Sequence, residues 1–220
     1  MSFFPFLELF IKGNQENFTA EEEAIERKNS WYDYLIYSVV FIQYFMLFLF
    51  AYRISQLNLT WYECIGMTWT MGLACGILGI NLGHELGHRT KKYEQNMAKS
   101  LLLTSLYMHF YIEHNRGHHK NIATPLDPAT SRLNEPIYKF YFRSIIGGWL
   151  SAWHLESHRL KKMGISFWSI QNEMLRFQVI QFTYLITLFT IFSLVGPFGW
   201  KSGLVVVVGA IGAAIFKKEK

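Results

Sequence analysis

Cysteine is scarce in this chain, with only Cys64 and Cys75 among its 220 residues. The two stand far from any CxxC pattern in apolar sequence, so we interpret both as packed, reduced thiols. This excludes a disulfide framework and a cysteine-based metal site. The sequence also lacks an internal repeat, and no basic stretch precedes the apolar residues at its N-terminus. We therefore expect neither a repeat architecture nor a cleavable signal.

Charge is nearly missing from three long blocks, in a chain that is 51% hydrophobic and 17% aromatic. Residues 32–52 carry only Asp33, residues 60–83 carry only Glu63, and residues 177–200 carry no charge. Each block has about the 20 residues needed to cross a hydrocarbon core about 30 Å thick. Backbone groups in lipid need partners within their own helix. The sequence therefore predicts an all-α, integral membrane helical bundle.

Two further apolar blocks are too short to be assigned as spans by length alone. Residues 202–216 are a provisional fourth span, and residues 97–112 are expected to form a re-entrant or interfacial helix. Residues 137–163 are rich in aromatic and basic side chains, which is typical of a helix at a membrane surface. Residues 1–30 are interpreted as an amphipathic lead-in to the first span.

The distribution of positive charge predicts an orientation. With the spans placed as above, Arg53 and Lys201 fall on one side of the membrane, and the remaining lysines and arginines lie on the other side or at its boundary. By the positive-inside rule, the second face is predicted to be cytoplasmic. The net charge of +5 does not indicate nucleic-acid binding, because the basic residues form no patch interleaved with aromatic side chains.

Five of the eight histidines form two clusters at the predicted cytoplasmic helix ends. His84 and His88 are four residues apart, a spacing that puts both rings on one face of a helix. His114 and His118 repeat this spacing, and His119 adds an adjacent ring aimed in a different direction. Ionisable groups within membrane helices are functional candidates, and neutral imidazole is a common metal ligand. The sequence therefore predicts a metal site.

Each cluster also carries a carboxylate, Glu85 in the first and Glu113 in the second. These are candidates either to bridge a metal or to orient a ligating ring through a hydrogen bond. Read alone, His84-Glu85-x-x-His88 is also the zinc-protease pattern, with Glu85 as general base. A single zinc site, however, needs only three protein ligands. Five imidazoles fit two metals better, and a nitrogen-rich site with open positions suits iron that binds oxygen.

Three histidines lie outside these clusters. His109 is off the face shared by the second cluster, and we expect it to support the site without binding metal. His154 and His158 repeat the four-residue spacing around Glu156. Because they lie on a basic amphipathic stretch, we expect them to be solvated.

Four segments resemble the membrane alkane 1-monooxygenase family, a branch of the membrane fatty acid desaturase/hydroxylase superfamily. The likeness runs from about residue 5 to residue 200. Its most specific part is the second histidine cluster with the proline-containing segment after it. The segments are NLGHELGH at 81–88, HFYIEHNRGHH at 109–119, ATPLDPATSR at 123–132 and SAW at 151–153.

This resemblance implies a non-haem di-iron enzyme that uses O₂ to hydroxylate alkanes to 1-alkanols. It implies rubredoxin and rubredoxin reductase as electron donors, membrane lipids as surroundings, and the bacterial inner membrane as location. It also implies a set of iron ligands, which are His84, His88, His114, His118 and His119.

The family has a third histidine box, whereas no histidine follows His158 here. We therefore expect residues 1–220 to form a single partial di-iron oxygenase domain that lacks this box. Three alternatives stay open: a membrane fatty-acid desaturase or hydroxylase, an intramembrane zinc metalloprotease that uses Glu85, and an inactive membrane fragment.

Overall fold

The computed structural model describes Thr19, Glu21 and residues 29–216, and every regular element in these residues is a helix. The predicted all-α fold is thus confirmed. The tail 217–220 and nearly all of the predicted lead-in lie outside the described residues. The chain forms two compact units, Met1–Ile36 and Tyr37–Lys220, and the packing below is that of the second unit. The elements are α3 (Ser30–Gln56), α4 (Trp61–Ala74), the π-helical η1 (Cys75–Ile80), α5 (Asn81–Gly87), α6 (Lys92–Thr104), α7 (His109–Glu113), the π-helical η2 (His114–His118), α8 (His119–Asn121), α9 (Ile137–Lys162), α10 (Glu173–Val195) and α11 (Trp200–Phe216).

Among the residues that the structure describes, three helices are long and apolar enough to cross a membrane. They are α3, α10 and the continuous helix Trp61–Gly87, which α4, η1 and α5 form together. All three coincide with the blocks predicted from the sequence. Their outer faces carry exposed aromatic and aliphatic side chains such as Phe41, Trp69 and Ile186. Exposed apolar surface of this kind is expected of helices that face lipid.

The single charge of the second predicted span lies at the start of the helix. Glu63 Oε2 accepts hydrogen bonds from the backbone N–H of Thr60 at 2.9 Å and from the Thr60 hydroxyl at 2.6 Å. This is the capping-box arrangement, and the positive end of the helix dipole favours a carboxylate there. Glu63 therefore caps the helix and does not interrupt its apolar interior.

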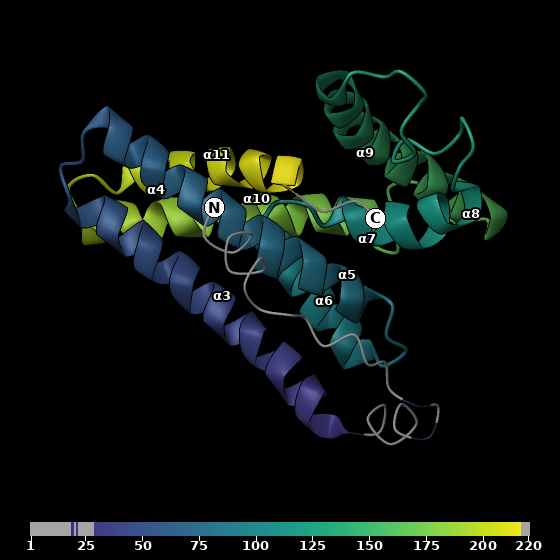
Figure 1. The fold of residues 1–220 in the computed structure, drawn as a ribbon, viewed down its shortest axis with the longest axis horizontal. Helices are drawn as coiled ribbons and strands as arrows, with labels where there is room; N and C mark the ends of the chain where they lie inside the picture. Colours follow the sequence, from purple (N-terminus) through teal and green to yellow (C-terminus); the bar gives the residue numbers. More distant parts are fainter. Residues whose placement is uncertain (1–18, 20, 22–28, 217–220) are drawn as a thin grey trace. The chain divides into compact units, whose positions relative to one another are not determined.

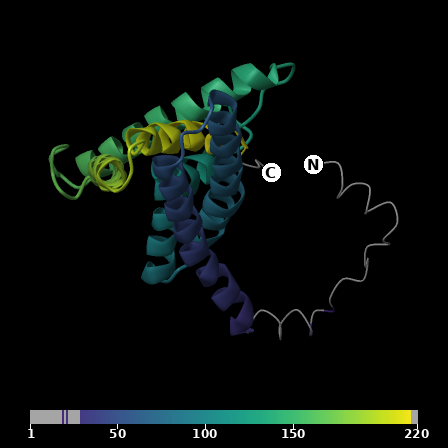
Figure 2. The same cartoon turned by 90° about the vertical axis from the view of Figure 1, so that its left-hand side faces the viewer.

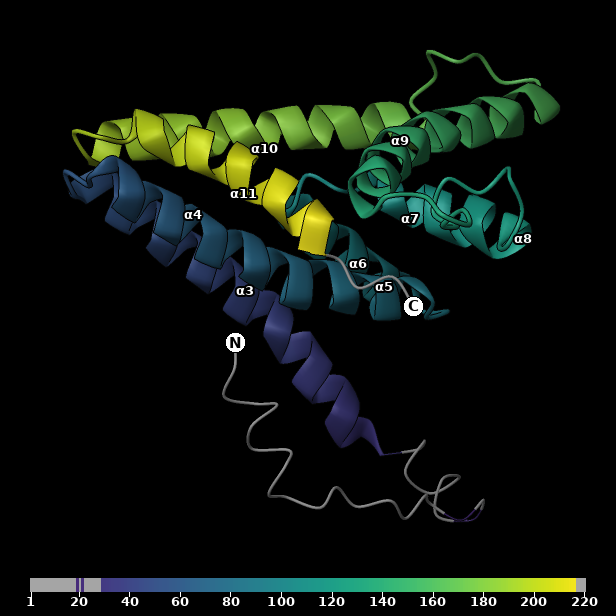
Figure 3. The same cartoon turned by 45° about the horizontal axis from the view of Figure 1, so that its top comes forward.

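The connections α3–α4 and α10–α11 lie at the same end of the bundle. The backbone N–H of Phe198 donates to the Ser55 carbonyl at 3.1 Å, and the Gln56 side chain donates to the Val195 carbonyl at 3.0 Å. The helices α5 and α8, which together with η2 carry the clustered histidines, lie at the other end (Figure 3). The charge-based orientation assumes this arrangement, with the connections near Arg53 and Lys201 at one end of the bundle and the histidine clusters at the other.

The provisional fourth span is helical, and it packs against α4 (Figures 1 and 2). Small residues allow the close approach of the two backbones. A Cβ atom added to Gly72 would lie only 3.0 Å from the Gly209 carbonyl oxygen, and Ala213 is fully buried nearby.

The segment 97–112, expected as one short helix, is divided by a turn. Helix α6 ends at Thr104, and Leu106 has a left-handed φ of 51°. The Ser105 hydroxyl donates to the Cys75 carbonyl of η1 at 3.3 Å. This hydrogen bond to another helix holds the turn in place. The second histidine cluster therefore follows a new helix direction.

Two glycines let the helix of the first histidine cluster lie close to α6. A Cβ atom at Gly83 would lie 3.1 Å from Leu102 Cγ and 3.3 Å from the Ala98 carbonyl oxygen. A Cβ atom at Gly79, one turn earlier, would lie 3.4 Å from the Leu101 carbonyl oxygen. The pair thus fixes the distance between the span and α6, and with it the position of the first cluster.

Replacing Gly83 with leucine is expected to destabilise the protein by about 1–3 kcal/mol, because the new side chain has no space against α6. The measurement is thermal unfolding of the purified protein in detergent. Gly66→Leu is the matched control, since a Cβ atom at Gly66 meets nothing within 4 Å. Equal losses of stability in the two variants would contradict the close-packing role of Gly83.

Candidate metal centre

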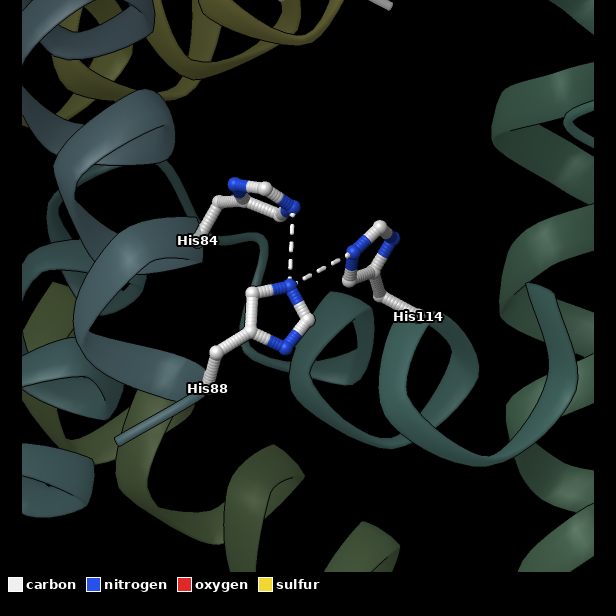
Figure 4. A group of neighbouring side chains, drawn as sticks. All are labelled: His84, His88 and His114. Carbon is white, nitrogen blue, oxygen red and sulfur yellow. Dashed lines mark hydrogen bonds between the residues drawn. The ribbon is translucent and has the colours of Figure 1, made fainter. Parts of the chain in front are cut away.

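The first histidine cluster stands at the end of the helix Trp61–Gly87. His84 lies in α5 and His88 is the residue that ends it. Their Nε2 atoms are 3.0 Å apart (Figure 4). The four-residue spacing therefore brings the two rings together on one helix face, as predicted.

The second cluster is arranged differently from the α-helical expectation. In η2 the backbone N–H of His119 donates to the carbonyl of His114, five residues earlier. A π-helical turn of this kind brings residues i and i+5 onto one face. The His114 and His119 Nε2 atoms are accordingly 3.1 Å apart. His119, expected to point in a different direction, joins His114, and His118 does not.

His88 is the centre of a group of four imidazoles drawn from both clusters. Its Nε2 lies 3.0 Å from that of His84, 3.2 Å from that of His114 and 3.4 Å from that of His119. One ring nitrogen carries at most one hydrogen, so hydrogen bonding among the rings does not account for all three contacts. Metal–nitrogen bonds of about 2.1 Å at angles of about 90–109° place neighbouring donors about 3.0–3.4 Å apart. The donor separations therefore fit a bound transition metal.

The electrostatics of the group favour neutral rings. Burial, together with the surrounding imidazoles, lowers the pKa of His114 to about 2. Burial also lowers the pKa of His88, helped by His119 and weakly opposed by Glu85. A neutral imidazole can present a lone pair to a metal, whereas a protonated one cannot. These rings are thus in the ligand form at physiological pH.

His118 has a separate partner in the loop that follows. Its Nδ1 lies 2.9 Å from Asp127 Oδ2, and the Asp127 side chain is fully buried. The same carboxylate accepts the backbone N–H of Ala129 at 2.9 Å and the Thr130 hydroxyl at 2.5 Å. A carboxylate that accepts from Nδ1–H fixes the tautomer of the ring and leaves Nε2 as the metal-binding atom.

The two carboxylates singled out from the sequence have different surroundings. Glu85 is half exposed and forms an ion pair with Arg89 at 3.4 Å. Glu113 is buried in α7, and a Cβ atom at Gly117 would lie 3.0 Å from its Oε1. Glu113 therefore lies inside the fold beneath the second cluster, while Glu85 stands at the surface.

A charged network holds η2 to the helices around it. Arg116, between His114 and His118 in sequence, donates to Glu156 of α9 at 3.0 Å and also to Glu173 of α10. The Glu156 carboxylate has no exposed surface, and its Oε1 also accepts the backbone N–H of Glu173 at 2.7 Å. The turn that aligns His114 with His119 is therefore anchored to two other helices.

The remaining histidines lie apart from this group. His109 is buried, with its ring 4.5 Å from that of Tyr107. His154 and His158 are exposed on α9, on either side of buried Glu156 in sequence. Glu156 binds two arginines and does not orient either histidine.

Sequence reasoning missed two carboxylates at this site. In the sequence, Asp127 stands out only as part of the family-like segment 123–132, and Glu156 only as the residue between two histidines. The available signals were weak: Asp127 lies between two prolines, Pro125 and Pro128, and Glu156 is the single acidic residue in the basic stretch 137–163. The structure adds the partners, His118 for Asp127 and Arg116 for Glu156.

Comparisons with known proteins agree with the histidine motifs. The chain is 43% identical over 161 residues to an alkane 1-monooxygenase of Pseudomonas putida, a match that covers 72% of this chain and 40% of that protein. It is 41% identical over 173 residues to the enzyme of that name from Ectopseudomonas oleovorans (76% and 43%). It is 40% identical over 164 residues to alkane 1-monooxygenase 1 of Alcanivorax borkumensis (73% and 40%). The resemblance inferred from the sequence is confirmed, and the matches span 40 to 43% of the length of these relatives.

The fatty acid desaturase family model matches residues 59–217. This range includes both histidine clusters, Asp127 and the charged network around Glu156. Together with the three apolar helices, the match identifies an integral membrane protein. The chain belongs to the fatty acid desaturase family.

Proposed function

We propose that this chain supplies the first two histidine clusters of a di-iron alkane 1-monooxygenase, which uses O₂ to hydroxylate alkanes terminally to 1-alkanols. The observation that carries the proposal is the approach of the Nε2 atoms of three imidazoles to within 3.0–3.4 Å of His88 Nε2, in a chain 43% identical to an alkane 1-monooxygenase. Residues 1–220 act in this proposal as a single partial oxygenase domain.

The proposed ligands of two iron ions are His84, His88, His114, His118 and His119. Iron bound there supplies the activation of O₂ that is needed to break an unreactive C–H bond. Burial keeps His88 and His114 neutral by lowering their pKa values, and the network around Arg116 holds η2 in its π-helical turn. Asp127 holds His118 in the tautomer that leaves Nε2 available.

The surroundings of the site suit a lipid-soluble substrate. Alkanes partition into the bilayer, and the outer faces of the candidate spans are apolar. We propose the bacterial inner membrane as location, with the histidine clusters on the cytoplasmic side, because the basic residues concentrate there. On that side rubredoxin, reduced by its reductase, is the proposed electron donor.

Metal analysis of the chain purified in detergent, with an octane-to-octanol assay, tests the proposal. The assay contains rubredoxin, its reductase and NADH, and a parallel arm offers a fatty acyl substrate. Iron bound at the two histidine clusters is the expected result, with octanol as the product of the proposed activity. Desaturated acyl product without octanol would favour the second candidate, a desaturase, which the family match supports. One zinc without iron, or iron without either product, would overturn the proposal.

Asp127→Asn is expected to lower the affinity for metal about 10- to 100-fold, since removal of a carboxylate that orients a ligating imidazole has an effect of this size. Isothermal titration with Fe²⁺ or Co²⁺ under nitrogen measures the change. The matched control is Asp33→Asn, the same chemical change in the first turn of α3. Unaltered affinity in Asp127→Asn would remove Asp127 from the proposed site.

A further inference from the structure

A second site lies between α6 and α10, in a cavity of about 310 Å³. Its volume is at the lower end of the range for ligand pockets. Its lining is of two kinds. Polar groups come from Asn96, Lys99, Ser100 and Arg176, and apolar groups from Leu103, Met108, Phe177 and Ile180.

Positive charge is in excess at the polar end of this cavity. Glu173 contacts Lys99 at 3.8 Å and Arg176 at 3.7 Å, and it also binds Arg116. Glu156, the next carboxylate of the network, is shared by Arg116 and Arg159. Among these six charged groups the cations outnumber the anions by two. Lys99 is mostly buried and Arg176 is half exposed, so both can contact a bound anion from the cavity side.

The two kinds of lining follow one another along α10, from its first turn into the candidate span. Arg176 lies in the first turn of α10, where this candidate span begins. Phe177 and Ile180 follow within the next turn, towards the interior of the span, and Phe177 is buried while Ile180 is 42% exposed. A ligand along this wall meets cations at the level of lipid headgroups and apolar side chains at the level of acyl chains.

We propose that this cavity binds an anionic phospholipid, with the phosphate at Lys99 and Arg176 and the start of one acyl chain along Leu103, Phe177 and Ile180. Basic pockets between membrane helices are typical sites for anionic headgroups. A free phosphate would leave the apolar wall uncovered, and an alkane would leave both cations without an added partner. Only an anionic amphiphile matches both halves of the cavity.

The bound lipid would act on the same network that anchors η2. Lys99 and Arg116 share Glu173, and Arg116 lies between two histidines of the second cluster. Phosphate at Lys99 would compete with Glu173 for the ammonium and strengthen the hold of Glu173 on Arg116. Lipid binding is measured without metal or turnover, so its outcome is independent of the proposed activity.

Native mass spectrometry of the full chain in detergent tests the proposal. Phosphatidylglycerol and phosphatidylcholine with the same acyl chains are added in parallel, and inorganic phosphate is a third arm. We expect tighter binding of phosphatidylglycerol, and about a fivefold weaker affinity in Arg176→Gln, the effect typical of one basic residue near an anionic headgroup. Lys99→Met with Arg176→Gln is expected to weaken binding about 25-fold if the two cations act independently.

The matched control is Arg132→Gln, an exposed arginine in the loop before α9 that does not line the cavity. Ile180→Trp keeps both cations and narrows the apolar half of the cavity. It is therefore expected to weaken the binding of phosphatidylglycerol without changing the binding of inorganic phosphate. Thermal unfolding of each variant verifies that it is folded. The proposal would be overturned by equal binding of the two lipids or by unchanged binding in Arg176→Gln. It would also be overturned if inorganic phosphate competed with the lipid while Ile180→Trp had no effect.

Discussion

His88→Ala is expected to cause the largest loss of metal binding of any single histidine substitution. The His88 Nε2 is within 3.4 Å of three other imidazole nitrogens, contributed by both clusters. Loss of a residue that only orients a ligand costs about 10- to 100-fold in affinity. Loss of His88, which is itself a proposed ligand, is therefore expected to lower the affinity for metal more than about 100-fold. Metal content after dialysis against a weak chelator, and alkane hydroxylation under the assay above, give the two readouts.

His154→Ala is the matched control, because His154 is exposed on α9 and outside the four-ring group. It is expected to retain the metal content of the unaltered protein. Thermal unfolding distinguishes loss of a ligand from loss of the fold. If His88→Ala and His154→Ala retain the same amount of iron, the proposed centre is wrong.

The membrane helices were predictable because their signal is local. Long runs without charge, such as 177–200, require no knowledge of neighbouring elements, and the structure has α10 and the start of α11 there. The one charge in the second block, Glu63, is compatible with the predicted span because it lies where the helix begins. Hydrophobic length thus specified the spans to within a few residues at each end.

The turn after α6 was not predictable from hydropathy. Thr104 and Ser105 precede Leu106, but two hydroxyl side chains in an otherwise apolar stretch do not by themselves indicate a break. The turn depends on contact with another element, the hydrogen bond from Ser105 to Cys75. An interaction between residues so far apart in sequence is invisible to a local pattern.

The histidine clusters were predicted as a site, but their internal geometry was not. An α-helical reading pairs His114 with His118, whereas the π-helical turn pairs His114 with His119. That turn is held by Arg116, whose partners Glu156 and Glu173 lie on α9 and α10. Because the spacing rule assumes a regular helix, it fails where tertiary contacts select another one.

Glu156→Leu is expected to cause the largest loss of stability among single substitutions outside the metal group. Its buried carboxylate accepts hydrogen bonds from Arg116 at 3.0 Å, from Arg159 at 2.6 and 2.8 Å, and from the Glu173 backbone at 2.7 Å. Removing one partner of a buried pair typically costs about 3–5 kcal/mol. Both arginines keep contact with solvent, which partly replaces the lost carboxylate, so we expect a loss of about 2–3 kcal/mol in the free energy of unfolding.

The acid dependence of this loss provides a sharper test. Burial alone would raise the pKa of Glu156, but hydrogen bonds from Arg159 and the Glu173 backbone, with the charges of Arg159 and Arg116, hold it below its ordinary value. A carboxyl group whose pKa is lower in the folded state stabilises the fold at pH values above its ordinary pKa of about 4.3. This contribution is lost as the pH falls through the pKa of the folded state. The unfolding temperatures of Glu156→Gln and the unaltered protein should therefore differ at pH 7.5 and converge only as the pH falls below about 4. The control, Glu85→Gln, removes an exposed pair and is expected to change stability by no more than about 0.5 kcal/mol at either pH. A pH-independent difference for Glu156→Gln would mean that its charge does not hold the network together.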